Sequence, residues 1–284
     1  MMVPSIDLYS ALHGLLEQIP DGMVSTPHHL ALALGDPSAD KAVTQAFRIG
    51  DMKNFSKKIV QNPGPGAFVF SDFVSDEPLK RLAELQRKMS KKVIREDSFD
   101  EADKFAGVDA VYQGDDAFAA CVVMDGGLGL LETASAFDHT RFPYFPGYLM
   151  FREAPIVETA AKIVSDFDVL FVNGHGIAHP RNCGLASCVG LDLDTPTIGV
   201  ARRRLVGDVG NKRNHWSPLT YDEEVVGAEV EVDDSRIYVS IGHKISLETS
   251  IKIVRGMTAE GLLPEPLRRA HKEANRMRGD RPRI

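Results

Sequence analysis

The chain has 284 residues, 43% of them hydrophobic and 26% charged, with a formal net charge of −7. These values are typical of a soluble globular protein of one large or two modest domains. No apolar run approaches the roughly 18–20 residues that cross a bilayer, and the first residues lack signal-peptide character, so we expect no membrane association. Three cysteines, Cys121, Cys183 and Cys188, are too few for a disulfide framework, which favours reduced thiols in a cytoplasmic protein.

The first 60 residues predict two short helices. The segment STPHHLALALG has a capping Ser25 or Thr26 and stops at Gly35, and PSADKAVTQAFRI follows with a capping Ser38. Two short helices joined by a glycine-containing turn indicate a helix-turn-helix, although many helical hairpins share the pattern. The breaker cluster NPGPG at Asn62–Gly66 then predicts a domain boundary, with a small helical domain at 1–65 and a larger domain at 66–284.

The larger domain is expected to be α/β. Residues 77–94 form an amphipathic helical pattern, after which the period changes to that of strands. Early strands follow each other closely and later ones alternate with helices, which predicts a mixed sheet covered by helices. The expected strands are 105–112, 119–125, 167–174, 195–201 and 236–244, and the expected later helices lie near 154–165, 183–193 and 246–257.

Three polar residues stand at positions where a metal site can form. Asp109 lies inside an apolar strand, Glu153 begins a helix, and Asn173 ends the strand DVLFV. Because a buried carboxylate is costly unless it is paired or metal-bound, these oxygens indicate Mg²⁺, or Mn²⁺ as a substitute, acting on a phosphodiester. The alternative is structural: Asp109 is an ion pair or turn acid, and Glu153 favours a helix N-terminus.

The histidines of NGHGIAHPR do not predict zinc. His175 and His179 are four apart, but Gly174 and Gly176 make a helix there unfavourable. A loop role fits better, with one histidine orienting the loop and the other contacting phosphate or water, unless both are satisfied by backbone bonds. The two later cysteines with a nearby histidine also provide too few ligands for zinc.

Two further features point to nucleic acid. The loop RFPYFPGY holds Tyr144 and Phe145 between prolines, so its aromatics can stack on a base, or else pack on their own core. Arginines cluster at 202–204 and, in the tail, at 276, 278, 281 and 283. Either cluster can bind phosphates or form a solvated face.

These motifs together resemble the endonuclease V family. The resemblance rests on PYFPGYLMFRE, NGHGIAHPR, GLASCVGLDLDTPTIGVARRRL, GHKISLETS and LPEPLRRAH, and covers residues 76–275. It implies a ribonuclease H-like fold and a Mg²⁺-dependent DNA repair endonuclease that nicks near deoxyinosine, a deaminated adenine, on its 3′ side. Some members also cut inosine in RNA, so either nucleic acid remains a candidate substrate for a monomeric enzyme.

The resemblance also implies roles for individual residues. Asp109 and Glu153 correspond to metal-binding carboxylates, Arg202 stands where many members have a lysine near the scissile phosphate, and Tyr144 falls on a wedge tyrosine. The implied catalytic residues are Asp109, Glu153, Asn173, His179 and Arg202. The implied nucleic-acid contacts are Pro143, Tyr144, Phe145, Pro146, Gly147, His175, His271 and, in the first domain, Lys41. Asp168 falls at a further polar position near the site.

Asn173 departs from the family pattern, which is usually DGHG with a metal-binding aspartate. A carboxamide keeps the shape and one oxygen but removes a negative charge. We therefore expect weaker metal binding and reduced cleavage, or, as an alternative, a non-catalytic protein that binds inosine or another lesion.

Residues 5–60 resemble the DNA-binding half of the alkylguanine alkyltransferase family, a winged helix-turn-helix. The resemblance rests on IPDGMVSTPHHLALALGDPSADKAVTQAF. The acceptor motif PCHRV is absent, Thr26 replaces the usual tyrosine, and Lys41 stands where the family has an intruding arginine. The module is thus expected to bind DNA without accepting an alkyl group, and a lesion sensor of alkyltransferase type is a third reading.

Overall fold

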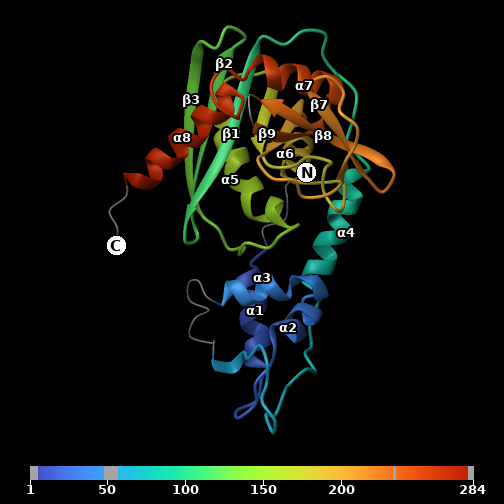
Figure 1. The fold of residues 1–284 in the computed structure, drawn as a ribbon. Helices are drawn as coiled ribbons and strands as arrows, with labels where there is room; N and C mark the ends of the chain where they lie inside the picture. The colour runs from blue at the N-terminus through green and yellow to red at the C-terminus, as the bar shows by residue number, and fades with distance from the viewer. Residues whose placement is uncertain (1–5, 48–56, 233–234, 281–284) are drawn as a thin grey trace. The chain divides into compact units, whose positions relative to one another are not determined.

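The computed structural model describes residues 6–47, 57–232 and 235–280, and the chain divides into two compact units (Figure 1). The smaller unit holds the described residues up to Leu85 together with His139–Arg152, and the larger unit holds Gln86–Asp138 and the chain from Glu153 onward. This division differs from the boundary expected at Asn62–Gly66. Asn62–Gly66 lies inside the smaller unit. This unit also includes His139–Arg152, which is far away in the sequence.

The smaller unit contains both helices expected there. Thr26 caps the first by accepting a hydrogen bond from the His29 N–H (3.1 Å), and Asp36 caps the short 3₁₀ turn before the second. A helix at Leu8–Glu17 was not expected. The helices are α1 (Leu8–Glu17), α2 (Pro27–Ala33), η1 (Pro37–Ala39) and α3 (Asp40–Ala46). Helix α4 (Pro78–Ser90) begins in this unit and ends in the larger one.

The larger unit is built on a nine-stranded sheet with the order β3-β2-β1-β4-β5-β9-β8-β7-β6. Strands β1, β4 and β5 are parallel, whereas β2 with β1, β9 with β5, and the β9-β8-β7-β6 meander pair antiparallel, so the expected mixed sheet is confirmed. The strands are β1 (Lys104–Gln113), β2 (Asp116–Asp125), β3 (Leu130–His139), β4 (Val169–Asn173), β5 (Thr197–Ala201), β6 (Asp208–Val209), β7 (Trp216–Tyr221), β8 (Glu224–Val232) and β9 (Ser235–His243).

Helices cover both faces of this sheet. On one face, Ile198 of β5 belongs to a core that includes Val254 of α7 (Leu247–Gly256) and Leu267 of α8 (Glu265–Gly279). On the other face, the hydroxyl of Thr197 donates to the Ala186 carbonyl of α6 (Leu185–Leu193) at 3.0 Å. The remaining helix, α5 (Leu149–Ile163), was expected together with α6 and α7, whereas α8 was not.

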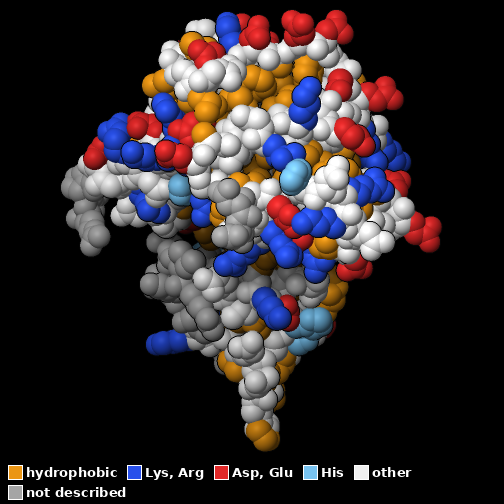
Figure 2. Space-filling view, turned by 45° about the horizontal axis from the view of Figure 1, so that its top comes forward, with side chains coloured by type: hydrophobic (Ala, Val, Ile, Leu, Met, Phe, Trp, Pro, Cys, Tyr) orange, Lys and Arg blue, Asp and Glu red, His pale blue; other side chains and the backbone are white. Residues whose placement is uncertain are grey.

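None of the helices within the described ranges has the length and apolar content that crossing a bilayer requires. The face drawn in Figure 2 carries its Lys and Arg side chains in groups rather than evenly spread. A net charge of −7 is therefore compatible with locally positive surfaces. Such surfaces attract a phosphate backbone when they lie within about a Debye length of it, ~10 Å.

Candidate active site

Three parallel strands bring polar residues to one edge of the sheet. Val108 of β1 is level with Val172 of β4, and Asn173 is level with Val200 of β5. Asp109 and Asn173 therefore lie side by side, and Arg202 follows the end of β5. Asp109 is 3% exposed, so its carboxylate needs partners inside the protein.

Asp109 has such partners on both oxygens. Its Oδ1 accepts hydrogen bonds from the Ala110 N–H (2.9 Å) and from Nδ2 of Asn173 (2.8 Å). Its Oδ2 lies 2.5 Å from Nδ1 of His271, which must carry the proton because an ionised carboxylate only accepts. The hydrogen bond to Asp109 raises the pKa of His271, while burial and the charges of Arg202 and Arg278 act in the opposite direction.

His271 reaches Asp109 because α8 packs directly on β1, as Figure 1 shows. A Cβ at Gly107 would lie 2.2 Å from the Leu267 nitrogen, so only glycine permits this approach. Two residues along a strand rise about 6.6 Å, and four along a helix rise about 6.0 Å. The distance along β1 from Gly107 to Asp109 thus matches the distance along α8 from Leu267 to His271. The close approach at Gly107 therefore brings His271 level with Asp109.

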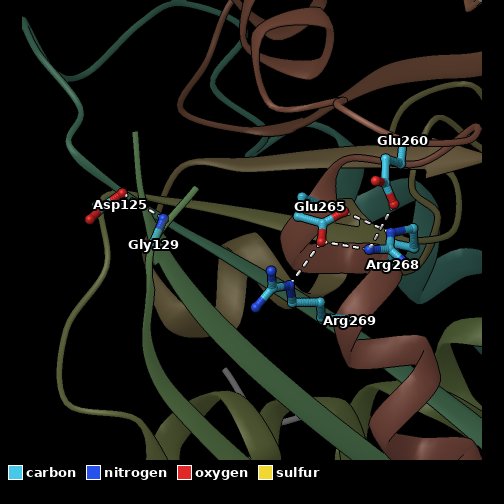
Figure 3. Close-up of polar contacts among 6 residues, drawn as sticks. All are labelled: Asp125, Gly129, Glu260, Glu265, Arg268 and Arg269. Atoms are coloured by element: carbon cyan, nitrogen blue, oxygen red, sulfur yellow. Dashed lines mark hydrogen bonds and ion pairs between the residues drawn. The ribbon is translucent and has the colours of Figure 1, made fainter. Parts of the chain in front are cut away.

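The first turn of α8 is held by a buried carboxylate (Figure 3). Glu265 is 5% exposed and accepts from Nε and Nη2 of Arg268 at 2.7 and 2.6 Å, and from Nε of Arg269 at 2.8 Å. The Arg268 guanidinium also lies 3.9 Å from Glu260, and on the nearby β2–β3 turn Asp125 accepts from the Gly129 N–H at 2.8 Å. The contacts of Glu265 fix the first turn of α8, from which His271 lies about one and a half turns further along the helix.

Two glycines allow the backbone of the loop after β4 to pack closely against neighbouring backbone. A Cβ at Gly176 would lie 1.9 Å from the Ile241 carbonyl oxygen, and one at Gly184 would lie 2.3 Å from that of His175. Nε2 of His175 is 2.9 Å from the Arg203 carbonyl, so this histidine connects the loop to the arginine segment after β5, and burial lowers its pKa. His179 is 4% exposed, and its Nδ1 accepts from the Arg181 N–H at 3.1 Å.

The proline-rich loop differs in part from expectation. Tyr144 is 57% exposed, but Phe145 is 1% exposed and packs edge-on against Phe142, with ring centroids 6.2 Å apart. The prediction that Phe145 presents its ring to nucleic acid is therefore wrong, because its ring belongs to the core of its own unit. Pro143 is also buried, whereas Pro146 is exposed and Gly147 adopts a φ of 79°.

The remaining expected residues are dispersed. Asp168 accepts hydrogen bonds from the N–H groups of Asp103 and Lys104 at 2.8 and 2.9 Å, at the beginning of β1. It lies five residues, or about 16 Å, before Asn173 along the chain, so its expected place near the site is wrong. Glu153 lies in α5 and exposed Lys41 in α3. Their roles stay predictions.

The donors present fit a hard divalent ion in chemical type. The Asp109 carboxylate and the Asn173 amide oxygen are the oxygen ligands that Mg²⁺ prefers. Nδ2 of Asn173 donates to the Asp109 carboxylate, and the pair carries one negative charge fewer than two aspartates. Two further residues shape the site. His271, which only the family resemblance implied, contacts Asp109, and Gly107, which the sequence did not single out, permits the close approach of α8.

The chain matches the family model described as Endonuclease V over residues 87–272. It is 43% identical over 199 residues to endonuclease V of Thermofilum pendens, covering 68% of this chain and 86% of that protein. It is also 34% identical over 301 residues to a bifunctional methyltransferase/endonuclease of Picrophilus torridus, which covers 94% of this chain and 95% of that protein.

Solved structures agree with these sequence matches. Endonuclease V of Streptomyces avermitilis superposes with a TM-score of 0.65 at 30% identity, covering 71% of this chain and 93% of that one. Ciona intestinalis endonuclease V, in complex with a 24mer DNA containing an inosine followed by a ribo-adenosine, superposes with a TM-score of 0.65 at 27% identity. That alignment covers 72% of this chain and 99% of the Ciona chain.

Proposed function

Because the chain belongs to the endonuclease V family, it is a metal-dependent DNA repair endonuclease, and we propose that it nicks DNA on the 3′ side of deoxyinosine. The observation that carries this proposal is the buried carboxylate of Asp109, held beside Asn173 and His271 at the edge of a mixed sheet. The sheet is of the kind expected for a ribonuclease H-like nuclease, and the Ciona relative is known in complex with inosine-containing DNA.

Asp109, Glu153 and the amide oxygen of Asn173 are the residues proposed to hold Mg²⁺, with Mn²⁺ as a substitute. When bound, such an ion makes water a better nucleophile and stabilises charge on the phosphodiester. Asp109 keeps His271 in the tautomer with a proton on Nδ1. Arg202, whose charge already acts on His271, stabilises the negative charge that develops on the phosphate.

His175 and His179 support the site from the loop between β4 and α6. The contact of His175 with the Arg203 carbonyl positions the backbone that carries Arg202. His179, the proposed catalytic histidine, is held by its bond with Arg181 and is buried, so a role toward phosphate or water requires movement on substrate binding.

Tyr144 is the residue proposed to occupy the strand opening when the target base is displaced into a pocket. Its ring is exposed, whereas the buried rings of Phe142 and Phe145 pack against each other and hold the loop in place. Pro146 and Gly147 shape the same loop and are the proposed backbone contacts to the strand.

The N-terminal unit is proposed to be a winged helix-turn-helix that binds DNA through α3 and Lys41. The Picrophilus relative named as a bifunctional methyltransferase/endonuclease extends over this unit, which supports a shared N-terminal module. No cysteine precedes Cys121, so the module lacks an acceptor for an alkyl group. It therefore contributes DNA binding rather than alkyl transfer.

Asn173 is proposed to weaken the nuclease. Its amide donates a hydrogen bond to Asp109. An aspartate at this position would instead repel Asp109 unless a cation lay between the two carboxylates. The same feature favours the second candidate, a protein that binds inosine without cutting. The family relation favours cleavage over this alternative, and inosine RNA remains a second substrate class.

The test compares the natural chain with Asn173→Asp on a deoxyinosine duplex and a matched adenine duplex, with Mg²⁺ or Mn²⁺. We expect a nick on the 3′ side of deoxyinosine alone, and a rate at least about tenfold higher for the variant. One added charge beside a divalent ion contributes more than the ~1.4 kcal/mol that corresponds to tenfold. Asn214→Asp, an exposed turn residue, makes the same charge change away from the site.

Equal rates for Asn173→Asp and the natural chain contradict the proposed role of this position. Inosine binding without product in both proteins favours the lesion-binding alternative, and faster cutting of an inosine RNA identifies RNA as the substrate. A cytoplasmic location is a further proposal, supported by three buried free thiols, and the chain is also proposed to act as a monomer.

A further inference from the structure

A second group of ligand-type side chains lies between α5 and α6. Glu158 of α5 and Cys188 and Asp192 of α6 each present one oxygen or sulfur atom, and these atoms lie within 4.8 Å of one another. Cys188 and Asp192 are four residues apart, so both project from the same side of α6. Since α6 packs against Thr197, which faces away from Ile198, this group lies on the sheet face opposite α8 and His271.

Glu158, one member of this group, has an unsatisfied oxygen. Its side chain is 7% exposed; Oε2 is 3.3 Å from Nζ of Lys162, but Oε1 is buried and accepts no hydrogen bond. A buried carboxylate oxygen without a donor is destabilising. Lys162 therefore satisfies Oε2 of Glu158 but not Oε1, which is left for a cation to neutralise.

We propose that Glu158, Cys188 and Asp192 bind a Zn²⁺ ion. Zinc accepts both thiolate and carboxylate ligands, at about 2.3 and 2.0–2.2 Å, and prefers a tetrahedral arrangement. Ligands at those lengths are about 3.5 Å apart, so a closure of roughly 1 Å from the observed spacing forms the site. Three protein ligands leave the fourth position to water.

The sulfur ligand distinguishes this site from the nuclease site. Mg²⁺ and Mn²⁺ select oxygen ligands such as those of Asp109, whereas a thiolate selects zinc and similar ions. On binding, the Cys188 thiol loses its proton to solvent, because coordination to a divalent ion stabilises the thiolate. Lys162, 53% exposed at its side chain, and partly exposed Asp192 mark the side from which an ion enters.

The role that follows is structural. An ion held by one ligand on α5 and two on α6 connects these helices across the gap between them. Helix α6 begins four residues after Arg181, the last residue of NGHGIAHPR, so fixing this helix also stabilises the end of that loop. Zinc is expected to raise the melting temperature without contacting the phosphodiester.

The test is Co²⁺ binding to the full-length protein after treatment with a chelator. A thiolate-to-cobalt charge-transfer band in the near-ultraviolet reports sulfur coordination, which the oxygen and nitrogen ligands of the nuclease site do not produce. We expect the band to saturate at one Co²⁺ per chain and to disappear on addition of one equivalent of Zn²⁺. Nicking activity is not part of this readout, so it fails or succeeds independently of the proposed function.

The variant Cys188→Ser is expected to abolish the band, and Glu158→Gln to weaken Co²⁺ binding at least tenfold. The matched control is Cys121→Ser, which removes a thiol that is equally buried but lies on β2. Absence of the band in the folded natural chain, or an unchanged band in Cys188→Ser, overturns the proposal. If Cys188→Ser does not fold, unchanged Co²⁺ affinity in Glu158→Gln overturns it instead.

Discussion

Replacing Gly107 by alanine tests how the last helix positions the site. The added Cβ would lie 2.2 Å from the Leu267 nitrogen and 2.3 Å from the Pro266 carbonyl carbon. Favourable contacts between such atoms begin near 3.5 Å, so the first turns of α8 must retreat by about 1.3 Å. Backbone atoms cannot rotate away, and the helix therefore moves as a whole.

The same retreat breaks the contact of α8 with the site. A shift of about 1.3 Å carries Nδ1 of His271 from 2.5 Å to roughly 3.8 Å from Oδ2 of Asp109, beyond hydrogen-bond range. We expect Gly107→Ala to lower the free energy of unfolding by about 2–3 kcal/mol, from overpacking and the gap opened under α8. Nicking should fall about 100-fold, the usual effect of a displacement of 1 Å in a catalytic arrangement.

Urea unfolding and single-turnover nicking of a deoxyinosine duplex measure the two effects. The matched control is Gly279→Ala, in the same helix, where an added Cβ has no atom within 4 Å and stability should change by less than about 0.5 kcal/mol. If Gly107→Ala unfolds and nicks like the control, close packing of α8 on β1 does not position His271 beside Asp109.

Three further outcomes are expected. Arg202→Ala should lower the single-turnover nicking rate about 100-fold with little loss of inosine binding, since its charge acts on the transition state; a loss in binding alone contradicts this role. Tyr144→Ala should leave thermal stability unchanged and reduce nicking, whereas Phe145→Ala, which empties a core position, should cost about 3–5 kcal/mol by urea unfolding; equal stabilities contradict this distinction. Burial, and then the charge of Lys244, lowers the pKa of His243, so protonation favours the unfolded chain as the pH falls below about 6.5. Urea unfolding at pH 7.5 and 5.5 should therefore show a larger loss of stability in the natural chain than in His243→Asn, and equal losses contradict the assignment.

The part of the site made by parallel strands could be predicted from the sequence. Asp109 interrupts an apolar strand, and Asn173 ends another, so both were candidates for the same sheet edge. Strand alternation and the rule that parallel strands end together suffice for this inference. The register of β1 with β4 then confirms that the two residues are neighbours.

The remaining features depend on docking between elements, which local patterns do not encode. That α8 approaches β1 through Gly107 follows from tertiary packing, and so does the choice of Tyr144 rather than Phe145 as the exposed ring. The cysteines at 183 and 188 provide too few metal ligands along the chain. Only the packing of α5 against α6 adds a carboxylate from 30 residues before Cys188.

The contribution of α8 has a consequence for the newly made chain. Asp109 and Asn173 are synthesised long before His271, and the helix that carries His271 covers apolar residues of β1 and β2, among them Val111 and Phe118. A nascent chain still lacking residues 265–279 has no His271 beside Asp109 and leaves this apolar sheet surface uncovered. On the proposed role of His271, cleavage is expected only once translation has passed this helix, and a chain interrupted before it is expected to self-associate through the uncovered apolar surface.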